Sequence, residues 1–342
     1  MPLIIPVFIP HEGCPHRCLF CNQYTISSSG RVLVTGSGVI ATVRSWLGRM
    51  RPEQRGQVEI AFYGGSFTGL PAERQVELLA AVQPFLQQDV VQTIRLSTRP
   101  DYIDTDGLML LRRYGVTTIE LGVQSCDDEV LRQAGRGHTS ADSVRASRLI
   151  QTQGFRLGWQ LMPGLPGENF RSLRDTIEKT VSVHPDFVRI YPTLVLKGSG
   201  LARLYGQGTY RPLSLNQAVA VVSRMKKRFD DQGIGVVRMG LQSSADLEEA
   251  LIAGPWHPAF GELVKARLML RETRRLLTGI ASSRPVELVI NSRDQSIFRG
   301  PRSLNLRRLE ELGLSTRFTL RPDPNQPRQT VKAVAENGTV LR

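Results

Sequence analysis

Three of the four cysteines in this chain lie within eight residues near its start. Cys14, Cys18 and Cys21 occupy the segment CPHRCLFC, and Cys126 is the only other cysteine. A 4Fe-4S cluster is normally held by four thiolates. Three thiolates on one short loop would leave one iron open to a small molecule, so the spacing predicts a cluster with an open coordination site.

The amine and carboxylate of S-adenosylmethionine could chelate such an open iron. An electron from the reduced cluster would then cleave the sulfonium and release a 5'-deoxyadenosyl radical, which abstracts hydrogen from an unactivated carbon. The cofactor does this chemistry and the protein positions it. The alternatives are a structural zinc site, which the nearby His11 and His16 could complete, and a chance cluster of buried cysteines. We interpret Cys126 as a small buried hydrophobe.

The composition favours an intracellular enzyme. Cysteines grouped as three plus one do not form a disulfide framework, so we expect a reducing cytoplasm. The opening MPLIIPVFIP suits a first core strand better than a signal peptide. No other stretch approaches the roughly 18 uninterrupted apolar residues of a membrane span, and we expect no membrane partner.

The positive charge is concentrated toward the end of the chain. Residues 255–342 hold 16 Lys+Arg against 8 Asp+Glu, whereas the first 254 residues hold 28 against 23. The Pro/Gly-rich segment GPWHPAF marks a boundary, which predicts a core domain over 1–254 and a basic extension over 255–342. A basic appendage is often a nucleic-acid footprint, although a solvated arginine-rich surface would look the same.

Short β-branched runs alternate with helical patterns along the core. Helices are expected over 72–85 and 140–153. Strands are expected at Leu3–Ile9, Val58–Tyr63, Thr93–Ser97, Thr117–Leu121, Arg156–Leu161 and Phe187–Tyr191. Six strand–helix units imply a parallel sheet with right-handed crossovers, here an open, partial (β/α)6 barrel of the TIM type. Chemistry in such barrels gathers at the carboxyl ends of the strands, where the cysteine loop and several polar residues fall.

The segments YGGSF, STRPDYID, TIELGVQS, AGRGHT, MPGLPGE and VRIYPTLVLKGSGL occur in an order that closely resembles the radical S-adenosylmethionine (radical SAM) core of the Elongator catalytic subunit. The resemblance runs from about Leu3 to Ser244. It implies a radical SAM barrel whose 4Fe-4S cluster and S-adenosylmethionine serve to modify a tRNA nucleoside. The core is more distantly similar to oxygen-independent coproporphyrinogen oxidases.

The resemblance also implies roles for single residues. Cys14, Cys18 and Cys21 would ligate the cluster. Gly64 and Gly65 would contact the methionine amine, and Gln124 and Gln160 would bind the ribose hydroxyls. Arg136 would pair with the methionine carboxylate, and Ser97 stands where the family has an acidic residue. Asp101 or Glu120 could compensate for that serine. On the substrate side, His138, Tyr191 and Lys197 match the family, and Tyr191 could equally be a core aromatic.

The Elongator subunit carries an acetyltransferase domain, and no segment after Ser244 resembles one. We therefore expect either a separate acyl-group donor protein or another use of the radical, together with an electron donor such as flavodoxin or ferredoxin. In the basic extension, Val286–Asn291 predicts a strand, 299–303 a basic loop, Leu304–Leu312 a helix and Ser315–Leu320 a strand. This order resembles half of a KH-type RNA-binding unit, whose GxxG loop clamps backbone nucleotides, with Ser303 in place of the second glycine. The expected phosphate contacts are Arg293, Arg299, Arg302, Arg307 and Arg308; a simple cap of the barrel is the alternative.

Three functions are therefore compatible with the sequence. The first is a radical enzyme acting on tRNA. The second is a radical enzyme acting on a small molecule such as a tetrapyrrole, in the manner of the coproporphyrinogen oxidases. The third is a non-catalytic binding or chaperone protein in which the cluster is structural. Cleavage of S-adenosylmethionine would separate the first two from the third.

Overall fold

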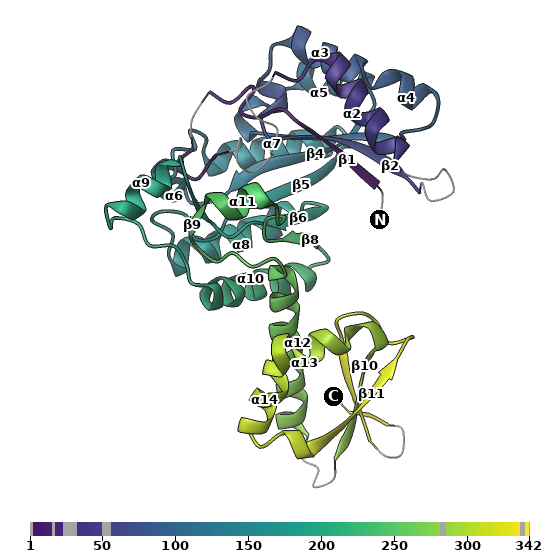
Figure 1. Ribbon diagram of the computed structural model, residues 1–342, viewed down its shortest axis with the longest axis vertical. Helices are drawn as coiled ribbons and strands as arrows, with labels where there is room; N and C mark the ends of the chain where they lie inside the picture. Colours follow the sequence, from purple (N-terminus) through teal and green to yellow (C-terminus); the bar gives the residue numbers. More distant parts are fainter. Residues whose placement is uncertain are drawn as a thin grey trace. The chain divides into compact units, whose positions relative to one another are not determined.

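The computed structural model describes residues 3–15, 18–22, 33–49, 56–280, 285–335 and 339–341. His16, named above as an alternative zinc ligand, lies outside these residues. The chain divides into two compact units (Figure 1). The first comprises residues 1–214 and 228–256, and the second comprises 215–227 and 257–342.

The first unit is built on one sheet of seven parallel strands in chain order. They are β1 (Leu3–Phe8), β2 (Val58–Tyr63), β3 (Thr93–Thr98), β4 (Val116–Gln124), β5 (Arg156–Leu161), β6 (Phe187–Ile190) and β8 (Gly235–Met239). Every neighbouring pair is parallel, from Leu3 opposite Val58 in β1 and β2 to Ile190 opposite Met239 in β6 and β8. The predicted partial barrel is confirmed, and all carboxyl ends lie along one edge.

The seventh strand was not predicted. β8 has the sequence GVVRM, and none of its residues is fully buried. A short, half-exposed segment lacks the apolar run that identifies an inner strand, so the sequence pattern missed it.

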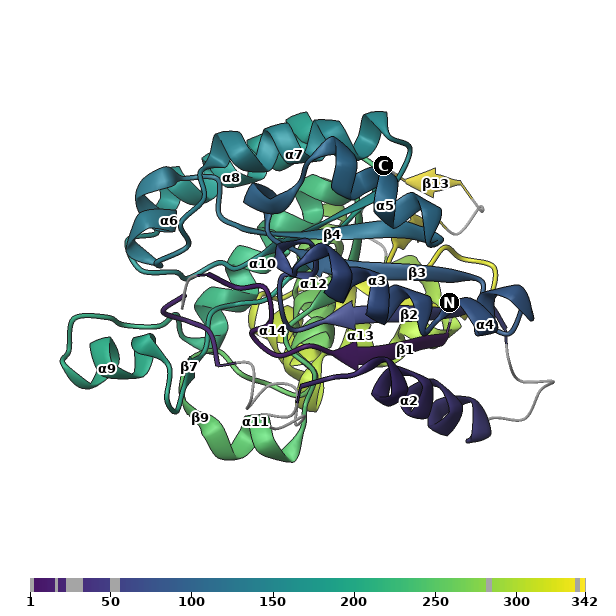
Figure 2. The ribbon, with the colours of Figure 1, turned by 90° about the horizontal axis from the view of Figure 1, so that it is seen from above.

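Helices connect successive strands. They are α2 (Gly36–Gly48), α3 (Ala72–Ala80), α4 (Gln83–Gln87), α5 (Thr105–Arg113), α6 (Asp128–Gln133), α7 (Ser140–Thr152), α8 (Phe170–Val183), α9 (Gly200–Gly206) and α11 (Ala245–Ala250). Figure 2 shows α7 and α8 side by side along the sheet. A small antiparallel pair joins β7 (Val195–Leu196) to β9 (Leu251–Ala253). The helix α10 (Leu215–Asp230) begins in the second unit and ends in the first.

The single helix predicted over 72–85 is wrong, because the structure has two helices there. Pro84 stands in the first turn of α4. Proline has no N–H to donate to the carbonyl four residues earlier, and its ring clashes with that carbonyl. One helix therefore ends at Ala80 and a second begins at Gln83.

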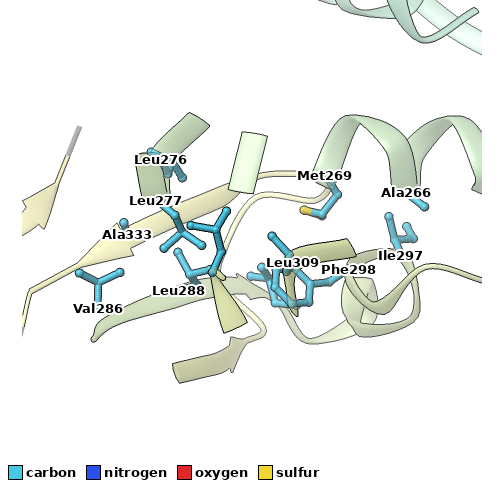
Figure 3. Packing of buried hydrophobic residues seen from close by; sticks show 12 residues of the cluster. Ala266, Met269, Leu276, Leu277, Val286, Leu288, Ile297, Phe298, Leu309 and Ala333 are labelled. Atoms are coloured by element: carbon cyan, nitrogen blue, oxygen red, sulfur yellow. The ribbon is translucent and has the colours of Figure 1, made fainter. Parts of the chain in front are cut away.

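The second unit packs helices against a mixed sheet. Its helices are α12 (Phe260–Gly279), α13 (Gln295–Arg299) and α14 (Leu304–Glu311), and its strand order is β11 (Phe318–Asp323), β10 (Val286–Asn291), β12 (Val331–Val334), β13 (Val340–Leu341). β10 and β11 are parallel, and the other two pairings are antiparallel. Figure 3 shows Leu277 of α12 pointing toward Leu288 of β10 within the buried apolar cluster.

Two details of this unit differ from the sequence analysis. The predicted strand Ser315–Leu320 begins only at Phe318, because residues Ser315–Arg317 form a 3₁₀ turn. The loop Gly300–Ser303 lies between two helices, since α13 precedes it. The loop is therefore held by a helix at each end.

Candidate active site

The cysteine loop follows β1 at the carboxyl edge of the sheet. Cys18 is buried, and Cys14 and Cys21 are half-buried; no disulfide joins them in the described residues. The amide of Leu19 donates to the carbonyl of Ala134 over 3.0 Å, and the carbonyl of Leu19 accepts from Leu201 over 2.8 Å. Phe20 packs against two apolar clusters that flank the loop. Apolar residues between the cysteines therefore anchor the thiols.

The glycine pair after β2 packs directly on this loop. A Cβ at Gly65 would come within 2.5 Å of the Ile9 carbonyl oxygen and still closer to that of Glu12. The amide of Ser66 donates to the same Glu12 carbonyl over 2.9 Å. Gly64 has φ +99°, a conformation that glycine adopts readily. The requirement for Gly65 follows from close backbone contact with the cysteine loop.

Arg136 connects the cysteine loop to β4. Its Nη1 lies 3.3 Å from Cys18 Sγ, and its Nη2 donates to the carbonyl of Gly122 over 2.5 Å. A Cβ at Gly122 would meet Arg136 Nη2 and Gln124 Nε2 at 2.9 Å. Gly122 thus leaves room for two of the predicted cofactor residues, which the structure brings together.

Arg99, which the sequence analysis did not select, is a second arginine of this region. It is 3% exposed, and its guanidinium makes two hydrogen bonds to the Asp101 carboxylate, of 3.0 and 2.7 Å. Arg99 Nη1 and Arg136 Nε are buried without a hydrogen-bond partner among the described residues. Arg99 could have been found in the sequence, because it directly follows a buried strand and Asp101 lies two residues after it.

The pKa of the Cys14 thiol is raised overall, and two guanidiniums partly offset this rise. Burial raises the pKa of the Cys14 thiol and so does the neighbouring Cys18, whereas the charges of Arg136 and Arg99 oppose this rise. A thiolate is the form that binds metal. Burial raises the pKa of Cys126 to about 12, so that thiol stays protonated, in agreement with its interpretation as a small hydrophobe.

The inner face of the sheet carries a buried ionic network. Glu120 is 0% exposed and lies 3.0 Å from Arg95 and 2.8 Å from Arg189. Arg95 also pairs with buried Glu59. The hydroxyl of Tyr63 lies 3.3 Å from Glu120 and 3.2 Å from Arg189. Both carboxylates that could compensate for Ser97 are therefore paired with arginines: Glu120 here, and Asp101 with Arg99.

The predicted ribose and amine residues separate into two groups. Gln160 Nε2 donates to Ser97 Oγ and to Glu120 Oε2, both over 3.0 Å, so Gln160 and Ser97 belong to the inner network. Gln124 instead ends β4 with φ +68°, a left-handed conformation that is uncommon for a residue with a side chain and recurs at functional sites. It lies beside Arg136.

The substrate-side candidates lie in different surroundings. Tyr191 lies beside Arg189, and burial raises the pKa of its phenol. His138 is 4% exposed, and burial together with Arg136 lowers its pKa to about 3, which keeps it neutral. Lys197 is exposed and lines an open cavity of about 410 Å³ that also includes Asn22 and Glu249. Asn22 Nδ2 donates to the Lys197 carbonyl over 2.6 Å, so Lys197 is placed beside the end of the cysteine loop.

The basic residues predicted for RNA all lie in the second unit. They are exposed and occupy the turn before α13, the end of α13, the following loop and α14: Arg293, Arg299, Arg302, Arg307 and Arg308. Arg308 pairs with Glu311 over 2.7 Å.

Two further observations concern the described residues as a whole. No three His, Cys, Asp or Glu side chains among them converge closely enough to hold a single metal ion. None of the helices described is both long and apolar enough to cross a membrane.

Unpaired guanidinium donors near Cys14 and Cys18 fit a bound group that has an acceptor. Arg99 Nη1 and Arg136 Nε are such donors, and buried polar atoms without partners are rare in folded proteins. A carboxylate matches a planar guanidinium. The part of the site that contains Cys14, Cys18 and the two arginines therefore fits a cluster held by the cysteines with the carboxylate of S-adenosylmethionine beside it.

Known protein families and curated proteins resemble this chain in sequence. The model of the Radical SAM superfamily matches residues 8–180, and that of the Radical SAM C-terminal domain matches 185–270. The tRNA uridine(34) acetyltransferase of Methanocaldococcus infernus is 28% identical over 261 residues, which cover 65% of this chain and 49% of that protein. Elongator complex protein 3 of Danio rerio is 31% identical over 264 residues, which cover 65% and 48%.

The same similarity is found among solved structures. Elp3 of M. infernus with an N-terminal deletion (1–46) matches with a TM-score of 0.63 at 22% identity, covering 79% of this chain and 63% of that one. The chain spans about half the length of the curated relatives it matches. The predicted resemblance to the Elongator core is confirmed. Because the first family model covers just over half of the chain, this chain belongs to the radical SAM superfamily.

Proposed function

We propose that this radical SAM enzyme modifies a nucleoside of tRNA, with a 4Fe-4S cluster on Cys14, Cys18 and Cys21. The observation that carries the cofactor part is the contact of Arg136 with Cys18 Sγ beside guanidinium donors that lack a partner. A reduced cluster of this type supplies the electron that cleaves S-adenosylmethionine to methionine and a 5'-deoxyadenosyl radical.

The chain's own residues would bind and orient this cofactor. Arg99 and Arg136 would direct their free N–H groups to the methionine carboxylate, and Asp101 would hold the Arg99 fork in place. Gln124, next to Arg136, would bind the ribose. Gly64 and Gly65 would offer backbone groups to the methionine amine, and Ser97 and Gln160 would line the interior beneath.

Several arguments support tRNA as the substrate. The matched relatives include a tRNA uridine(34) acetyltransferase, and the chain carries a net charge of +13 with the largest surplus in its final quarter. Polyanions bind such surfaces through counterion release. Tyr191 and Lys197 are the candidates for contact with the target nucleoside. A flavodoxin or ferredoxin would donate the electron, a separate protein would supply any acyl group, and a reducing cytoplasm would preserve the cluster.

Anaerobic reconstitution tests this proposal. The protein is loaded with iron and sulfide and reduced, and 5'-deoxyadenosine released from S-adenosylmethionine is measured with and without total tRNA. We expect slow release alone and clear stimulation by tRNA. If 5'-deoxyadenosine release is the same with and without tRNA, the substrate is instead a small molecule such as a tetrapyrrole. No release from a fully loaded cluster would favour a binding or chaperone role.

The two buried cysteines provide a matched pair of variants. Cys18→Ala should abolish 5'-deoxyadenosine formation because it removes a cluster ligand. Cys126→Ala should leave 5'-deoxyadenosine formation unchanged, since the Cys126 thiol is protonated and this residue follows the end of β4, outside the cysteine loop. An active Cys18→Ala variant would refute the assignment.

A further inference from the structure

The second unit has more exposed cations than its own acids can pair. Five acidic residues each pair with a basic residue within the unit: Glu262 with Lys265, Glu272 with Arg275, Glu287 with Arg321, Asp294 with Arg328 and Glu311 with Arg308. These pairs account for most of the negative charge after residue 256. The remaining arginines therefore have few anions available inside this unit.

Seven exposed arginines have no side-chain partner in residues 257–280, 285–335 and 339–341. They lie on α12, before α13, around the α13–α14 loop and on α14: Arg267, Arg271, Arg274, Arg293, Arg299, Arg302 and Arg307. The three on α12 are spaced by four and three residues, so they share one face of that helix. At 1.5 Å per residue they are about 6 and 4.5 Å apart along the axis. Like charges at this spacing repel one another and slightly destabilise the helix, and a polyanion opposite them would turn this repulsion into attraction.

The α13–α14 loop, which lies among these arginines, is held in place by Asn305 at the start of α14. The buried amide of Asn305 donates to the carbonyls of Ala266 on α12 and of Ile297 and Phe298 on α13, over 2.9, 3.3 and 3.1 Å. Gly300 lies against Asn305, where a Cβ would be only 2.8 Å from its side chain. The loop is thus fixed to both helices, and Ala266 immediately precedes Arg267.

The loop projects its residues into solvent. Pro301, Arg302 and Ser303 are exposed, and Arg302 and Ser303 both have positive φ, +49° and +59°. Ser303 occupies the place of the second glycine of a GxxG loop and has the left-handed conformation that glycine adopts most easily. Leu304, which follows, is 53% exposed and offers an apolar contact for a sugar or base. A rigid exposed loop loses little entropy when it binds.

We propose that the second unit binds the sugar–phosphate backbone of RNA through the α13–α14 loop, with the arginines of α12 extending the contact. Arginine suits this partner because its planar fork binds phosphate through two N–H groups. The identification of the RNA as tRNA rests on the proposed function, but binding needs neither cluster nor catalysis. A membrane surface is the less favoured partner, since Leu304 and Val340 are the only large hydrophobics exposed by 40% or more in the described part of this unit.

The test uses the full chain without cofactor. Affinity for fluorescent tRNA is measured by anisotropy over a range of salt for wild type, Arg299→Ala/Arg302→Ala and Arg267→Ala/Arg271→Ala. The matched control is Arg171→Ala/Arg174→Ala on α8 of the first unit, where both side chains are exposed and the same charge is removed. We expect the loop variant to bind about tenfold or more weakly and its slope of log K against log salt to fall by about 1.5. The α12 variant should show a smaller change in the same direction.

Further variants and measurements distinguish this inference from the proposed function. Arg299→Lys/Arg302→Lys should keep the salt slope and recover only part of the affinity. Release of 5'-deoxyadenosine without RNA should be the same in the loop variant as in wild type.

The inference would be overturned, with the radical chemistry left intact, if the loop variant kept wild-type affinity and salt slope. Equal losses of affinity in the loop and control variants would overturn it in the same way. Loss of binding to phosphatidylserine vesicles with unchanged tRNA binding would overturn it in favour of a membrane. If tRNA binding depends on the loop but the protein never cleaves S-adenosylmethionine, the inference is supported and the proposed function is refuted.

Discussion

At the scale of single residues, the site depends on arginines that support thiols. Arg136 contacts Cys18 Sγ and the carbonyl of Gly122 with two different nitrogens of one fork. Partners of this kind orient metal ligands, and their loss typically weakens metal binding 10- to 100-fold. The sequence predicted Arg136 as a cofactor contact from its resemblance to a family motif. The contact with Cys18, 118 residues away, depends on the fold.

Replacement of Arg136 by lysine tests this support. A lysine ammonium is a single point charge and cannot reach both partners in the fixed geometry of a guanidinium. We expect cluster affinity to fall about 10-fold or more, measured as iron and sulfide retained per chain after desalting. The control is Arg132→Lys, an exposed position on α6 paired with Glu129. Retention equal to wild type in Arg136→Lys would show that the cysteine loop holds the cluster unaided.

The inner network gives a second prediction at this scale. In Glu120→Gln the buried Arg95 and Arg189 would lose their shared carboxylate, and uncompensated buried charges are costly. We expect the free energy of unfolding to fall by about 3 to 5 kcal/mol, measured by urea denaturation. Glu129→Gln, on the surface, should change it by less than about 0.5 kcal/mol. A small effect at Glu120 would mean that water or Glu59 compensates the arginines.

At the scale of elements, the close contact of the glycine turn with the cysteine loop is open to a steric test. Gly65→Ala would press a methyl group into two backbone carbonyls, which cannot both retreat. We expect a loss of about 1 to 3 kcal/mol in stability and lower iron retention, because the loop that bears Cys14 must move. In α2, the Cβ of Gly38→Ala would have an ordinary contact at 3.5 Å, so this control should be neutral or slightly stabilising. Equal behaviour of the two variants would contradict the packing argument.

A pH effect belongs to the loop after β5. Glu168 accepts a hydrogen bond from the Gly164 amide over 2.6 Å, and burial raises its pKa to about 7. Between its unfolded pKa of about 4.5 and 7, the folded chain holds a proton that the unfolded chain has released. The contribution of Glu168 to stability therefore falls as pH rises through this window. Glu168→Gln should flatten the difference in unfolding free energy between pH 5 and pH 8, and an unchanged pH profile would refute the assignment.

The elements show how far sequence reasoning reaches. Strands such as Val58–Tyr63 were predicted with correct ends because buried parallel strands are near-continuous apolar runs. Glu59, Arg95 and Glu120 each interrupt one of these apolar strands. Their pairing could not be read, because it depends on the register of neighbouring strands. β8 was missed because its residues are half-exposed, and no local pattern identifies a strand that is stabilised mainly by pairing with the neighbouring strand β6.

At the scale of the whole molecule, the division into units is not a single cut in the sequence. The predicted boundary separates 1–254 from 255–342. The second unit of the structure, however, also includes Leu215–Lys227, which precede the last strand of the first sheet. No composition shift marks this segment, so local sequence could not assign it. A chain cut near residue 254 would therefore lack most, but not all, of the second unit.

Removal of residues 255–342 should leave Leu215–Lys227 of α10 without the rest of the second unit. Ala218, Val222 and Met225 lie at a spacing of four and three and form an apolar face, which would lose the residues of 257–342. We expect the chain ended after Gly254 to bind a hydrophobic dye more strongly than the full chain and to melt at a lower temperature. Adding residues 255–342 in trans should reverse both changes if the second unit can reassemble around Leu215–Lys227. A truncated chain that melts like the full one, without added dye binding, would show instead that the first unit alone stabilises the whole of α10 and that the boundary near 254 is the functional one.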